Sequence, residues 1–74
     1  MRNIVGSRVK LARCRFKPRM TQEALAVKLQ LDDWDIARSG IAKIEVGLRQ
    51  VTDVEVAKLA KVLEVSIAWL FGEQ

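Results

Sequence analysis

The stretch that decides the fold is TQEALAVKLQLDDWDIARSGIAKIEV, residues 21–46. It opens with Thr21, a favourable helix N-cap residue. Apolar residues then recur at helical spacing and define one inward face: Leu25, Ala26 and Leu29. The pattern predicts a helix over 21–29, an irregular segment over 30–35 and a second helix over 36–46.

The second of these helices has its own markers. Ile41 and Ile44 are its apolar anchors, and Gly47 lies where helices commonly end in a left-handed residue. If the two isoleucines face the core, the outer face carries four other side chains: Arg38, Ser39, Ala42 and Lys43.

On the N-terminal side of this stretch, apolar residues predict another amphipathic helix over 3–16. Its stripe consists of Val5, Val9, Ala12 and Phe16. We expect Pro18 to end this helix, because the residue before a proline is pushed out of the α region.

On the C-terminal side, Thr52 and Glu55 form a capping box that starts a fourth helix. Its expected buried face is Val56, Leu59, Ala60 and Leu63. Ser66 caps a short fifth helix with apolar residues Ile67, Leu70 and Phe71. No strand-like alternation is present, so the sequence predicts a single all-α domain over 1–74, a compact five-helix bundle.

The charge distribution is one-sided. Residues 1–22 hold seven basic residues and no acid, whereas the rest of the chain holds six basic residues and nine acids. Such a segment favours a polyanionic partner, most simply nucleic acid. The alternative is a solvated helix face that only aids solubility.

Composition excludes several classes of protein. The only cysteine is Cys14 and there is no histidine, so an internal disulfide, a Cys/His zinc site and histidine-dependent catalysis are excluded. No apolar run approaches the ~20 residues of a membrane span, and residues 1–10 are unlike a secretory signal. We expect a cytoplasmic binding module without a cofactor, and not an enzyme.

Two further features have competing interpretations. Cys14 lies between two arginines, which favour a reactive thiolate, but an inert thiol is the simpler reading. Asp32, Asp33 and Asp35 are clustered carboxylates of the kind that bind hard cations. We favour no metal there, with Asp35 as a helix cap and the other two as solvated turn residues.

Taken in order, these motifs resemble the phage-repressor and Cro-like helix-turn-helix domains, the XRE family. The resemblance extends over residues 6–72. It rests on GSRVK at 6–10, Arg13, TQEALA at 21–26, Ile36, RSGI at 38–41, KIE at 43–45, Gly47, and the stretch from Leu59-Ala60 through Val65-Ser66. It implies a lambda-repressor-like DNA-binding domain whose helix-turn-helix pair covers about 21–46.

The resemblance also implies roles for individual residues. The helix over 36–46 would enter the major groove, with base contacts from Arg38, Ser39, Ala42 and Lys43. The expected backbone contacts are Gln22, Ala37, Gly40, Arg49, Gln50, Lys17 and Arg19. Arg2 would reach DNA only as a loose arm. Arg13 and Glu45 would form a buried structural ion pair.

The chain departs from the family pattern between the two helices. Gln30 takes the usual glycine position, and the path to the next helix is longer by about five residues, 31–35. Ala37 stands where a capping serine is usual, which leaves Asp35 as the nearest capable residue. Gly40 lies inside the helix, as a tolerated weakness or as a point of close approach to the sugar-phosphate chain.

The expected function is that of a sequence-specific double-stranded DNA-binding transcriptional regulator, most simply a repressor. We expect a homodimer that is weak without DNA, with contacts from Trp69, Leu70 and Phe71. The alternative is an antitoxin-like or other protein-interaction module whose main partner is another protein.

Overall fold

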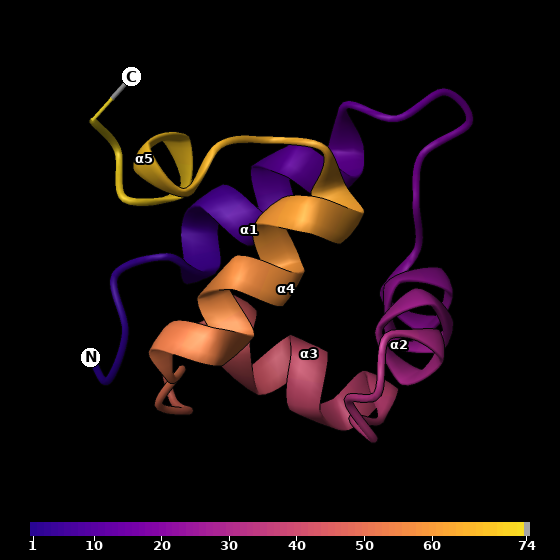
Figure 1. Ribbon diagram of the computed structural model, residues 1–74, viewed down its shortest axis with the longest axis horizontal. Coiled ribbons are helices and arrows are strands. Elements are labelled where there is room, and N and C mark those ends of the chain that lie inside the picture. The colour runs from indigo at the N-terminus through magenta and orange to yellow at the C-terminus, as the bar shows by residue number, and fades with distance from the viewer. Residues whose placement is uncertain (74) are drawn as a thin grey trace.

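The computed structural model describes residues 1–73, and that part of the chain is all-helical (Figure 1). Its helices are α1 (Gly6–Cys14), α2 (Gln22–Leu31), α3 (Arg38–Glu45), α4 (Asp53–Leu63) and α5 (Ile67–Leu70). The domain measures 26 × 24 × 20 Å. α3 packs against both α1 and α2, α4 packs against α1 and α2, and α5 packs against α1 and α4. This arrangement confirms the expected all-α five-helix bundle.

Three helices begin at the predicted capping residues. The hydroxyl of Thr21 accepts from Ala24 N, and that of Ser66 accepts from Trp69 N. At α4, Thr52 and Glu55 form the complete capping box. These caps succeed because each satisfies an otherwise unpaired first-turn amide with a side chain nearby in the sequence.

The core lies where the apolar periodicity places it. The inward residues predicted for α2, α3 and α4 are all buried, as are Val5, Val9 and Ala12. Met20 and Ile36, which lie outside the helices, add to the core, and Phe16 packs against it while half-buried. No helix in the described part of the chain has the length and apolarity needed to cross a membrane.

The first helix is shorter than the predicted 3–16 range. It spans Gly6–Cys14, so it ends before Pro18 can act on it. After Cys14 the chain turns back, and the carbonyl of Arg13 accepts hydrogen bonds from both Phe16 N and Met20 N. Burial of Met20 therefore ends the helix, since a continued helix would carry that side chain away from the core.

The segment between α2 and α3 also differs from expectation. α2 continues through Leu31, so Gln30 lies in a helix and not in the turn. The left-handed residue is Asp33, with φ 64°. α3 starts at N-cap Ala37 without any side-chain cap, and the prediction that Asp35 caps it is wrong.

Two hydrogen bonds explain this path. Trp34 N donates to Leu29 O (3.0 Å), and Gln30 Nε2 donates to Ile36 O (2.9 Å). They fold the segment against the end of α2 and bring Ile36 into the core. The burial of Ile36 then determines where α3 can begin.

Candidate nucleic-acid interface

The outer face of α3 carries the side chains expected to meet DNA bases. Ile41 and Ile44 are fully buried on the opposite face. Arg38, Ser39 and Lys43 are therefore turned to solvent, and Ala42 is half-buried at the edge of that surface. The face offers two cationic donors and one hydroxyl on a short helix.

Beneath this face, Arg13 of α1 and Glu45 of α3 form an ion pair with two contacts. Arg13 Nε donates to Glu45 Oε2 (2.7 Å), and Nη2 donates to Oε1 (2.9 Å). The hydrogen bond to Glu45 also raises the pKa of the Arg13 guanidinium. Arg13 Nη1 donates to Met20 O (2.8 Å), so the guanidinium joins α1, α3 and the turn before α2.

Gln22 belongs to the same network. Its Nε2 donates to Glu45 Oε1 (3.0 Å), which links the first turn of α2 to the end of α3. An amide nitrogen carries two hydrogens, so this bond leaves one for a phosphate oxygen. The structure thus gives Gln22 an internal partner that sequence reasoning missed.

An open hollow of about 480 Å³ lies where α2 begins. Its lining brings together three residues expected at the interface, Arg19, Gln22 and Arg38, with Arg13, Thr21 and Glu23 beside them. Arg19 and Arg38 are exposed there, so positive charge is concentrated next to the first-turn amides of α2. Such an arrangement attracts anions.

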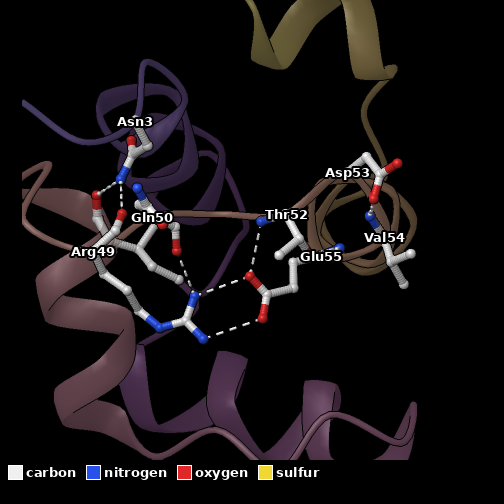
Figure 2. Close-up of polar contacts among 8 residues, drawn as sticks. Asn3, Arg49, Gln50, Thr52, Asp53, Val54 and Glu55 are labelled. Carbon is white, nitrogen blue, oxygen red and sulfur yellow. Dashed lines mark hydrogen bonds and ion pairs between the residues drawn. The ribbon is translucent and has the colours of Figure 1, made fainter.

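Arg49 is positioned mainly by the protein itself. Its guanidinium donates to Glu55 Oε1 (3.0 Å) and Oε2 (3.1 Å), and to Gln50 O (2.8 Å), as Figure 2 shows. The hydrogen bond with Glu55 raises the pKa of Arg49 and lowers that of Glu55. The guanidinium also lies 5.5 Å from the ring centroid of Trp34. Gln50 is exposed.

Gly40 has an internal packing reason. A Cβ at this position would lie 2.7 Å from Cγ1 of Ile36, which is buried. The glycine therefore admits Ile36 to the core, a reason that neither of the two sequence interpretations included. Ala37 is exposed at the helix start.

The basic segment does not form one continuous surface. Lys17 and Arg19 are exposed in the turn between α1 and α2. By contrast, Arg8 and Arg15 lie over the ring of Trp69, at 4.7 and 5.4 Å from its centroid. Two cations of the basic segment therefore lie against α5, apart from Lys17 and Arg19 in the turn.

Asp32, in the acidic segment before α3, connects the end of α2 to α4. Asp32 Oδ1 accepts from Lys61 Nζ (2.9 Å), and the same bond lowers the pKa of Asp32. Lys58 Nζ donates to the Asp32 backbone carbonyl and lies 3.8 Å from Oδ2. Asp32 is thus an anchor to α4 and not a solvated turn residue.

Cys14, the free cysteine of α1, is half-buried.

The sequence pattern gives Asn3 no role beyond the start of the predicted first helix. Its carboxamide bonds the first residue of α1, the end of α3 and the turn after α3. The one sequence signal is the Asn-x-x-Gly spacing of Asn3 and Gly6, which suits a side-chain bond to a helix start.

Comparison with known proteins identifies a family. A family model described as "Helix-turn-helix" matches residues 9–70, which include all five helices from within α1 to the end of α5. No curated protein and no solved structure matches the chain.

Proposed function

The chain belongs to the XRE-type helix-turn-helix family of DNA-binding transcription regulators, and on this premise we propose that it is a repressor that reads a specific duplex sequence with α3. The observation that carries the proposal is the exposed face of α3. Arg38 and Lys43 stand on it beside Ser39, while Ile41 and Ile44 fasten the opposite face to the core.

Base contacts come from four residues of α3 in this proposal. Arg38 and Lys43 donate to guanine O6 and N7, which are acceptors in the major groove. Ser39 bonds a base edge or a phosphate, and Ala42 contacts a thymine methyl group. Repression then requires only that the bound domain blocks the promoter.

Phosphate contacts fix the register on the duplex. Gln22 and Arg19 hold a phosphate at the hollow before α2, where backbone amides and positive charge coincide. The remaining proposed backbone contacts are Lys17, Ala37, Gly40, Arg49 and Gln50. Of these, Arg49 uses three of its five N–H groups on Gln50 and Glu55, and the other two are left to donate to a phosphate.

A homodimer completes the proposal. Leu70 has no exposed surface, so it cannot belong to the expected contact with Trp69 and Phe71. Phe71 is 41% exposed and Ile4 is 67% exposed, and both line a shallow groove of about 340 Å³. We place the dimer contact on these two residues, because both are exposed and apolar. So small an apolar area is below that of a stable interface, and the dimer should therefore be weak without DNA.

Selection of bound sequences from a random duplex pool tests the proposal. We expect one enriched, near-palindromic motif with half-sites about one helical turn apart. Sedimentation should show a monomer without DNA and two copies on the selected duplex. Transcription from a promoter that contains the motif should fall when the protein is added. A pool that stays unenriched after repeated selection would contradict sequence-specific reading.

A further inference from the structure

We propose that Asn3 is a positioning residue for the recognition helix: its carboxamide holds the end of α3 and the following turn against the start of α1. This inference rests on the proposed function, because it concerns how α3 is presented to a duplex. Asn3 itself contacts no base in the proposal.

The carboxamide of Asn3 makes three hydrogen bonds. Nδ2 donates to Ile44 O (3.1 Å) and to Arg49 O (2.7 Å), and Oδ1 accepts from Gly6 N (2.8 Å). The Gly6 amide settles which end of the carboxamide is oxygen, since an N–H needs an acceptor. Both side-chain donors are therefore used inside the protein, as Figure 2 shows for Arg49.

Two of these bonds act at the end of α3 and in the turn after it. The last carbonyls of a helix lack the regular intrahelical donor, and Ile44 O, in the last turn of α3, accepts instead from Gly47 N (3.0 Å). Asn3 adds a second donor to this carbonyl from 41 residues away in the sequence. The same segment adds a backbone bond from Arg2 N to Gly47 O (2.7 Å).

The start of α1 lies unusually close to the end of α3, at Gly6 and Ile44. A Cβ at Gly6 would lie 2.0 Å from Ile44 O, so only glycine permits the approach. The bond from Asn3 to the same carbonyl sets both the separation and the rotation of the end of α3.

The turn after α3 is fastened on two sides. The carbonyl of Arg49 accepts from Asn3, while its guanidinium pairs with Glu55 at the start of α4 (Figure 2). The opposite end of α3 has no side-chain cap at Ala37, and it is held instead by the buried Ile36 and by the bond from Gln30 Nε2 to Ile36 O. Asn3 therefore acts on the orientation of this eight-residue helix at its C-terminal end.

Three variants separate positioning from general stability. Asn3→Asp keeps the oxygen that accepts from Gly6 but removes both donors, and Asn3→Ala removes all three bonds. Ser66→Ala is the matched control, since it removes a helix cap at α5, away from α3. Melting temperatures of all three are measured first, and all binding is measured well below them.

The first readout needs no DNA. In the free protein, amide hydrogen exchange over residues 42–47 should be about tenfold faster in Asn3→Asp than in wild type. Ser66→Ala should leave exchange in that range unchanged. Equal exchange in Asn3→Asp and Ser66→Ala would overturn the proposal, even if Asn3→Ala failed to fold.

The second readout is affinity for the selected duplex and for random duplex. We expect Asn3→Ala, which adds no charge, to weaken the selected duplex about tenfold, with random duplex and the salt slope unchanged, because no phosphate contact is lost. A reduced salt slope would show direct phosphate contact and overturn the positioning role. If wild type itself prefers no duplex, the proposed function fails, and with it the role in recognition. Faster exchange over 42–47 would then still identify Asn3 as an anchor of α3.

Discussion

Arg13 and Glu45 lie 32 residues apart and meet in a paired, almost fully buried contact in which their side chains are 8% and 3% exposed. The pair joins α1 to the end of the recognition helix. In the described part of the chain, every buried side-chain nitrogen and oxygen has a hydrogen-bond partner, so each charge depends on the other.

We expect Arg13→Ala or Glu45→Ala to lower the free energy of unfolding by about 3–5 kcal/mol, because each leaves a buried charge unpaired. That loss is a large part of a small domain's stability. Urea denaturation followed by circular dichroism measures it. The double variant Arg13→Met/Glu45→Leu should recover only part of the loss, because Met20 O and Gln22 Nε2 still lose their partners. A pair of solvated charges would instead show losses below about 1 kcal/mol in each single variant.

DNA-binding variants test the roles of single residues. Arg38→Ala and Lys43→Ala should each weaken the selected duplex by about 1–3 kcal/mol and random duplex much less, because base contacts carry the sequence information. Gln22→Ala should weaken both duplexes alike. Fluorescence anisotropy at several salt concentrations measures these affinities. An equal loss on both duplexes for Arg38→Ala would identify a phosphate contact.

The effect of Gly40→Ala on stability should reverse its sign with the size of the side chain at position 36. Gly40→Ala should destabilise the protein by about 1 kcal/mol, because the clash with Ile36 costs more than the gain in helix propensity. In an Ile36→Ala background the clash is absent, and the same substitution should stabilise by up to about 1 kcal/mol. Thermal melts of the four proteins complete the cycle. Stabilisation in both backgrounds would show that Ile36 does not restrict position 40.

Glu64 occupies a left-handed conformation at the end of α4, with φ 60°. Val65 N donates to Ala60 O (3.0 Å) around it, a closure in which glycine is usual. Glu64→Gly should therefore raise stability by about 1 kcal/mol and the melting temperature by roughly 4–8 °C. Glu64→Ala is the control, since it removes the charge but keeps the strain. A rise of the same size in Glu64→Ala would assign the effect to charge.

The lowered pKa of Glu55 predicts an acid dependence of stability. Its ion pair with Arg49 contributes fully above the ordinary glutamate value of 4.5 and is lost as pH falls through the lower folded value. The melting temperature of wild type should thus fall below about pH 4.5, and Glu55→Gln should fall less over the same range. Glu23→Gln, which changes an exposed carboxylate of α2, should follow wild type. Parallel curves for Glu55→Gln and wild type would contradict this assignment.

Local patterns in the sequence were sufficient for the helices and most of the core. Thr21, Thr52 and Ser66 cap the helices that they were expected to cap, and the predicted inward faces of α2, α3 and α4 are buried. Caps and periodicity succeed because they depend on residues three or four positions apart. The face of α3 that the proposed function uses was predictable for the same reason.

Tertiary structure decided what depends on residues far apart in the sequence. The end of α1, the start of α3 and the burial of Leu70 follow from which side chains the packed helices admit to the core, and no local pattern contains that information. The partner of Asn3 across 46 residues is of the same kind. The basic segment divides because α1 turns Arg8 and Arg15 toward Trp69. Charge counted along the chain records composition, whereas the direction of each side chain is set only when the helices pack.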